Sequence, residues 1–173
     1  MDKPLDNNAD RLNALVEVQG YLNEAHFDLY AFMELVVEQM QKLTPATGVI
    51  IELVEGDNMI YRAATGSAKP HLGLSLPREN SISGLCVTSH QILRCDETEK
   101  DERVNLPACR KVGARSMVVA PLFHNGDAIG VLKILSDKPH AFSEDDVKTL
   151  QLMAGYIASG LAKQMLQEFR DFI

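Results

Sequence analysis

Two stretches near the start of the chain repeat apolar residues at spacings of three and four, the period of an amphipathic α-helix. The first spans residues 7–24, and we expect it to find little of its own domain to pack on. Its apolar positions are Leu12, Leu15, Val16, Val18 and Leu22. The second follows the cap residue Asp28 and ends at Thr44-Pro45, because the residue before a proline avoids the helical conformation.

From residue 47 the period changes to that of β-strands. Residues 49–54 and 59–64 flank the turn 55–58, which predicts a β-hairpin. Residues 116–123 and 128–135 flank Asn125-Gly126, a dipeptide favoured in tight hairpin turns. Between the hairpins we expect a short helix over residues 85–90 and brief strands within 72–77 and at 91–94.

A long helix is predicted after Ser143, which can cap it, with Phe142 stapled against Val147. Its apolar stripe continues to the end of the sequence, beyond what a small sheet can cover, so we expect the excess to point outward. The order of elements predicts an α+β fold with long terminal helices. A central antiparallel sheet of five or six strands would carry helices packed on one face.

Composition narrows the class of protein. The chain of 173 residues is 46% hydrophobic and 24% charged, and its net charge of −7 argues against a nucleic-acid partner. No apolar run reaches the length of a membrane span, and the first residues do not resemble a signal peptide. We therefore expect a cytoplasmic protein with reduced thiols and no membrane contact.

All three cysteines lie in the irregular stretch from Ser81 to Pro121. Cys86, Cys95 and Cys109 have no Cys-x-x-Cys pairing, and their spacing matches no compact metal-ligand pattern. We therefore predict no metal. Burial as small apolar residues is favoured over a nucleophilic or redox-sensing role.

Four arginines lie in or near the same stretch of this acidic protein. Arg94, Arg103, Arg110 and Arg115 are bidentate donors suited to carboxylates and phosphates. Ion pairs with the nearby acidic residues at 96–102 are the favoured interpretation. If one arginine meets a ligand, Arg115 is our choice.

Several motifs together resemble a GAF domain, a family of small-molecule sensor and dimerisation modules. The stretches that carry the resemblance are Gly-Ala-Arg-Ser-Met-Val-Val-Ala-Pro-Leu at 113–122, Asn-Gly at 125–126, Ile-Gly-Val-Leu-Lys at 129–133 and Phe-Ser-Glu-Asp-Asp at 142–146. The Ser-Gly-Leu-Cys, Asp-x-Arg-Val and Ala-Cys-Arg elements are similar to GAF domains attached to bacterial diguanylate cyclases and histidine kinases.

The resemblance implies a domain at residues 27–162, an N-terminal dimerisation or linker helix at 1–26 and a helical extension at 163–173. It implies two-component or cyclic-di-GMP signalling. Either the protein works alone, or an output domain, a diguanylate cyclase or histidine kinase, is attached in a longer parent chain. The ligand pocket would lie between the sheet and residues 81–115, and its small-molecule ligand is unidentified. Candidate ligand-binding residues are Ser83, Cys86, Arg103, Arg115 and Ser116.

Subfamily motifs match only in part. Lys133, Phe142 and Asp146 match the pattern of cyclic-nucleotide-binding members, but Leu132 and Val147 replace its Asn and Glu. The partial match implies a structural ion pair between Lys133 and Asp146. The cysteine that anchors a bilin in phytochrome-like members has no equivalent here, so no covalent bilin is expected and the cofactor is unknown.

The enzymatic alternative within this resemblance is free methionine-(R)-sulfoxide reductase. Its chemistry would use thiols from among Cys86, Cys95 and Cys109, one attacking the sulfoxide and another resolving a disulfide. The carboxylates that hold the substrate ammonium in that family are absent, since Met117, Lys133 and Leu135 stand at their positions. We therefore favour a module without catalysis of its own.

Homodimerisation through the terminal helices is the remaining expectation. The apolar stripes of both helices can be covered by a second copy in a helical bundle. The candidate dimer residues are Leu12, Leu15, Leu22, Ile157, Leu161 and Met165.

Overall fold

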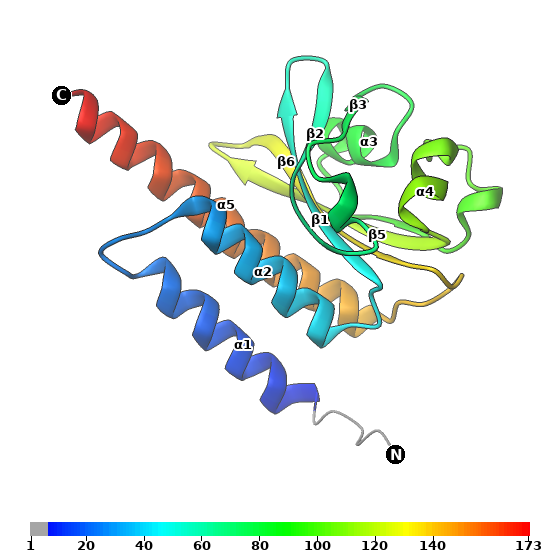
Figure 1. The fold of residues 1–173 in the computed structure, drawn as a ribbon, viewed down its shortest axis with the longest axis horizontal. Coiled ribbons are helices and arrows are strands. Elements are labelled where there is room, and N and C mark those ends of the chain that lie inside the picture. Colours follow the sequence, from blue (N-terminus) through cyan, green and yellow to red (C-terminus); the bar gives the residue numbers. More distant parts are fainter. Residues whose placement is uncertain (1–6) are drawn as a thin grey trace.

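The computed structural model describes residues 7–173 and contains one antiparallel sheet of six strands in the order β3-β2-β1-β6-β5-β4 (Figure 1). The predicted α+β fold with its central sheet is confirmed. The two predicted hairpins, β1–β2 and β5–β6, form the middle of the sheet. The strands are β1 (Gly48–Glu55), β2 (Asn58–Gly66), β3 (Ser75–Pro77), β4 (Leu93–Cys95), β5 (Ser116–His124) and β6 (Asp127–Ser136).

Helices cover both faces of this sheet (Figure 1). The long helices α1 (Asn7–Leu22), α2 (Leu29–Leu43) and α5 (Glu144–Phe172) pack on one face. The short helices α3 (Ile82–Ser89) and α4 (Leu106–Val112) pack on the other. Two short 3-10 helices, Lys69–His71 and Thr98–Lys100, lie in the connections.

Strand alternation divides the core into two layers. On β6, Leu132 and Ile134 pack toward α2 and α5, whereas Val131 and Leu135 pack toward α3 and α4. This is the period of two expected for a strand buried on both faces. Position 133 therefore faces the α3 and α4 side.

Local capping sets the helix ends. The Asp28 side chain accepts a hydrogen bond from the backbone N–H of Ala31 at 3.0 Å, which caps α2. Ser143 and Asp146 form a reciprocal capping box at the start of α5. The predicted starts of both helices are thus explained by side-chain chemistry.

The first helix is better packed than expected. Ala14 and Val18 of α1 are buried in the same core layer as α2 and α5, so the expectation that this helix lacks its own packing surface is wrong. Lys163 of α5 donates hydrogen bonds to the carbonyl oxygens of Leu22 at 2.5 Å and Glu24 at 3.1 Å. These bonds join α5 to the end of α1.

The dimer candidates separate into buried and exposed residues. Ile157 and Leu161 are buried inside the chain's own core, so neither offers a surface to a second copy. Leu15 and Leu22 are partly buried against the same core, whereas Leu12 and Met165 are exposed. The outward stripe of α5 instead contains Leu152, Leu166 and Phe169. Within residues 7–173, no helix combines the length and apolar character needed to cross a membrane.

Candidate functional site

The central strands β1 and β6 bring two charged side chains into the apolar layer beneath α3 and α4. Lys133 Nζ lies 2.6 Å from Glu52 Oε1, and their side chains are only 7% and 1% exposed. Lys133 also donates to Ser83 Oγ at 3.3 Å and lies 5.4 Å from the centre of the Tyr61 ring. Strands of both hairpins and the first turn of α3 thus meet at one polar cluster, which we call the Lys133 cluster: Glu52, Tyr61, Ser83 and Lys133.

The pKa of Lys133 reflects two opposing effects. Burial alone would lower it, because an ammonium group loses its hydration. The neighbouring Glu52 carboxylate reverses this effect and raises the pKa of Lys133 above its ordinary value. Burial also raises the pKa of Tyr61. Lys133 therefore remains an ammonium and Tyr61 a neutral phenol at neutral pH.

One atom of the cluster has no hydrogen-bond partner among the described residues. Glu52 Oε2 is inaccessible to solvent, although a buried carboxylate oxygen without a donor costs free energy. Glu52 lines a small cavity of about 20 Å³, which also reaches Asn105 and Cys109 of the α4 region. That space is close to the size of one water molecule.

The residues of α3 fit closely over this cavity. Ser81 caps α3 by accepting a hydrogen bond from the Gly84 N–H at 3.0 Å. A Cβ atom at Gly84 would lie 1.7 Å from the carbonyl oxygen of Arg78, so glycine is needed for the helix to approach the preceding segment. The same turn brings Ser83 onto Lys133.

The predicted ion pair between Lys133 and Asp146 is absent from the described structure. Lys133 faces α3 and α4, whereas Asp146 is in the first turn of α5, which packs on the opposite face. Asp146 accepts a hydrogen bond from the Ser143 N–H at 2.8 Å and so serves the helix cap. The sheet separates the two side chains, and Glu52 is the true partner of Lys133.

Of the five ligand-binding candidates, only Ser83 lines the cavity. Cys86 is buried nearby and its thiol donates to the Val119 carbonyl oxygen at 3.7 Å. Arg103 is in an open surface cleft. Ser116 donates to the Lys138 carbonyl oxygen at 2.6 Å, which fixes the turn before α5.

The favoured interpretation of the four arginines is confirmed, because each pairs with a nearby acid. Arg115 pairs with Glu97 at 2.9 Å and is therefore not available at the cavity. The other pairs are Arg94 with Asp96 at 2.9 Å, Arg103 with Asp101 at 2.6 Å and Arg110 with Glu99 at 2.9 Å.

All three thiols are free and buried. Burial raises the pKa of Cys86 to about 12, and burial followed by hydrogen bonding to Asp101 raises that of Cys95 to about 12. Burial also raises the pKa of Cys109. Thiols with raised pKa values are poor nucleophiles at neutral pH. Within residues 7–173, no group of His, Cys, Asp and Glu is arranged to hold a metal ion.

Sequence reasoning missed Glu52 and Tyr61. Glu52 directly follows the apolar run Val49-Ile50-Ile51. Because side chains alternate along a strand, Glu52 lies on the same face of the sheet as Ile50, the face that α3 and α4 cover. An acidic residue at such a position requires a partner, and Lys133 occupies the equivalent inward position in the second hairpin. That pairing was a signal available in the sequence.

Solved structures similar to this chain share its fold. The GAF domain of a phosphoenolpyruvate-protein phosphotransferase from Coxiella burnetii has a TM-score of 0.81 and 18% identity, over 94% of this chain and 99% of that one. Free methionine-R-sulfoxide reductase from Neisseria meningitidis, solved with its substrate, has a TM-score of 0.76 and 19% identity over 92% and 93%. Residues 122 to 287 of a methyl-accepting chemotaxis protein have a TM-score of 0.71 and 23% identity over 89% and 98%.

At these identities the likeness establishes the fold alone. No curated protein matches the chain significantly. The model of the GAF domain family matches residues 28–162, which is most of the sequence and contains the whole sheet and the Lys133 cluster. The chain therefore belongs to the GAF domain family.

Proposed function

We propose that this GAF domain is a sensory or regulatory module that binds a small polar molecule at the Lys133 cluster. The observation that carries the proposal is the Glu52 carboxylate, which is buried with one oxygen unpartnered among the described residues and adjoins a cavity. A ligand that donates a hydrogen bond to Glu52 Oε2 would remove the free-energy cost of that oxygen. Because its volume is only about 20 Å³, the cavity admits a molecule larger than water only when α3 or α4 moves.

Contacts from the segment between α3 and α4 to α5 support a signalling role. The Arg103 guanidinium donates to the Arg94 carbonyl oxygen at 2.7 Å. The Arg94 side chain in turn donates to the Phe142 carbonyl oxygen and, at 3.1 Å, to Glu144 in the first turn of α5. A shift of the segment between α3 and α4 is therefore passed to the start of α5 through hydrogen bonds.

The strands provide a second route. Lys133 lies between Leu132 and Ile134, whose side chains pack on the opposite face against the long helices. A ligand that changes the position of Lys133 also acts on this packing. We propose that the terminal helices dimerise and relay the change to an output domain, a diguanylate cyclase or histidine kinase, in a longer cytoplasmic protein.

The direct test is native mass spectrometry of the chain purified from its own host under non-denaturing conditions. We expect a bound small molecule in the wild type and its loss in the double variant Glu52→Gln, Lys133→Met, which removes both charges together. The variant's fold is checked by circular dichroism. Equal occupancy in the two folded proteins, or none in the wild type, would contradict the proposal.

The reductase alternative has fold-level support only, from the similar enzyme structures. The buried thiols with raised pKa values argue against it. We expect no turnover of free methionine sulfoxide with thioredoxin and NADPH. Turnover that is abolished by Cys109→Ser would establish the enzyme instead.

A further inference from the structure

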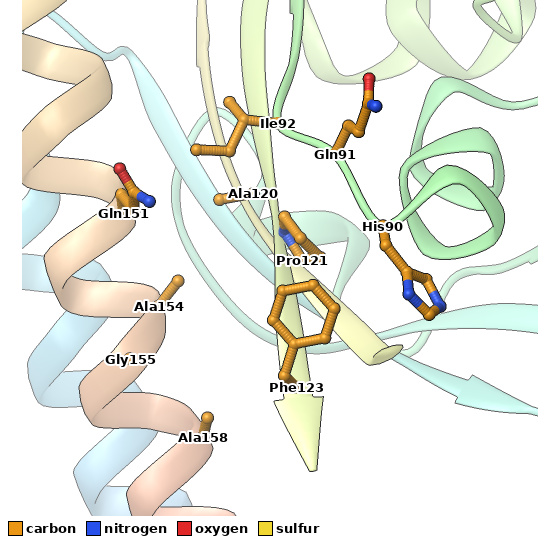
Figure 2. Close-up of a pocket in the computed structure, with 10 residues that line it drawn as sticks. All are labelled: His90, Gln91, Ile92, Ala120, Pro121, Phe123, Gln151, Ala154, Gly155 and Ala158. Atoms are coloured by element: carbon orange, nitrogen blue, oxygen red, sulfur yellow. The ribbon is translucent and has the colours of Figure 1, made fainter. Parts of the chain in front are cut away.

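A second cavity lies beside β5, between α5, β5 and the residues that connect α3 to β4 (Figure 2). We call it the α5–β5 hollow. Its volume is about 390 Å³, against about 20 Å³ at the Lys133 cluster. It is lined by His90, Gln91, Ile92, Ala120, Pro121, Phe123, Gln151, Ala154, Gly155 and Ala158.

Two features of the fold create the hollow. The wall on α5 consists of small residues, Ala154, Gly155 and Ala158, and a Cβ atom built on Gly155 would meet no described atom within 4 Å. The other feature is the shortness of β4, which pairs with β5 only as far as Leu93 opposite Val119. After Val119, the remainder of β5 therefore has no β4 residue paired beside it.

The lining is apolar and aromatic with a few polar groups at its margin. Phe123 is 42% exposed, and its ring meets the His90 ring edge-on at a centroid distance of 5.5 Å. Gln91 and Gln151 contribute polar groups to the lining, with Gln151 on α5 and the Gln91 amide pointing away from that helix (Figure 2). None of the ten lining residues is Asp, Glu, Lys or Arg, so a charged occupant would find no counter-ion.

An added peptide strand is a poor occupant. Pro121 has no N–H to donate to a neighbouring strand, and proline on a free edge blocks strand addition. A cavity of this size, mostly apolar with a few polar groups, is instead typical of small-molecule sites. Exposed aromatic rings favour a flat aromatic ligand, packed edge-on or offset.

We propose that the α5–β5 hollow is a second small-molecule site, which takes a neutral, flat, largely apolar ligand with one or two hydrogen-bonding groups. It is separate from the Lys133 cluster, because the two cavities share no lining residue and only the α5–β5 hollow is lined by α5. Helix α3 connects them, with Ser83 at its start and His90 as its C-cap. The ligand would contact α5 directly.

Fluorescence of N-phenylnaphthylamine, a neutral aromatic probe, tests this site. The chain has no tryptophan, so background emission is low. We expect saturable binding of one probe molecule per chain. We also expect about tenfold or greater weakening in Gly155→Leu and Ala158→Leu, because their side chains fill the hollow. Gly20→Leu is the matched control, a helical glycine of α1 whose Cβ also meets no described atom.

The proposal would be overturned if the probe did not bind saturably, or if Gly155→Leu and Ala158→Leu bound it as tightly as the wild type does. It would also be overturned if Gly20→Leu weakened probe binding equally, or if the wild type bound the anionic analogue anilinonaphthalene sulfonate as tightly as the neutral probe. Affinity that falls as the protein concentration rises would also contradict it, because a second copy would then cover the hollow. The double variant Glu52→Gln, Lys133→Met should bind the probe normally, which separates this site from the Lys133 cluster.

Discussion

Lys133 and Glu52 depend on each other because both charges are buried. Removing one partner leaves an uncompensated charge in an apolar layer, whereas removing both often costs little. We predict that Lys133→Met lowers the free energy of unfolding by about 3–5 kcal/mol at neutral pH. Urea denaturation measures this change.

The control for that prediction is the double variant Glu52→Gln, Lys133→Met, which should recover most of the lost stability. If the single and double variants are equally unstable, the buried charge of Glu52 is not the cause.

Asp101 gives a prediction about pH. Hydrogen bonds from Arg103 lower its pKa from the ordinary 3.8 to about 2, so folding favours the ionised carboxylate. The resulting stabilisation is present above pH 3.8 and is lost as the pH falls toward 2. Because the pair is partly exposed, we expect it to contribute no more than about 1 kcal/mol.

Carboxyl carbon NMR of Asp101 checks this pH dependence. The titration midpoint should be near pH 2 in the wild type and move toward the ordinary value in Arg103→Gln. A midpoint that is the same in both proteins would show that Arg103 is not responsible.

Two glycines of α5 give opposite predictions for the same substitution. A Cβ atom on Gly160 would lie 2.6 Å from the buried Phe32 ring, whereas one on Gly155 would meet open space among the described residues. Gly155→Ala should stabilise the chain by about 0.5–1 kcal/mol, because alanine is the better helix former. Gly160→Ala should destabilise it by about 1–3 kcal/mol through overpacking.

Thermal unfolding of the two variants compares the same added methyl group on one helix. A stabilising Gly160→Ala would mean that α5 moves away from α2 at little cost. A destabilising Gly155→Ala would mean that this position is covered rather than open.

Elements that depend on local chemistry were predictable from the sequence. The turn at Asn125-Gly126 and the Ser143 cap each rest on a few neighbouring residues, and both are present. Helix α4 was not predicted, because it is only seven residues long, although the Asn105 cap and Pro107 in its first turn are typical of a helix start. Short helices depend on tertiary packing more than on periodicity.

The pairing within the site was harder to predict than its elements. The cavity lies between the sheet and the stretch from Ser81, and two of its lining residues, Glu52 and Lys133, are separated by 81 positions. Strand register decides which side chains meet across such a distance. The predicted pair of Lys133 and Asp146 failed because it linked neighbours in sequence that lie on opposite faces.

The whole molecule presents an apolar stripe on the outer side of the C-terminal half of α5. Its positions are Ala162, Leu166 and Phe169, at spacings of four and three. The large residues of this stripe are exposed, with Leu166 at 59% and Phe169 at 63%. On α1, Leu12 and Val16 are exposed in a similar way. Such spacing is typical of helices that pack against another helix.

We predict that the chain forms a homodimer through this stripe and that Leu166→Glu raises the dimer dissociation constant about a hundredfold, by burying a charge at an apolar contact. Sedimentation equilibrium measures the constant. Gln164→Glu is the control, because it adds the same charge on the opposite side of α5. Leu161→Ala should instead lower the free energy of unfolding by about 2–5 kcal/mol, since Leu161 is buried in its own chain. A wild-type protein that stays monomeric at all concentrations, or equal effects of both glutamate variants, would refute this interface.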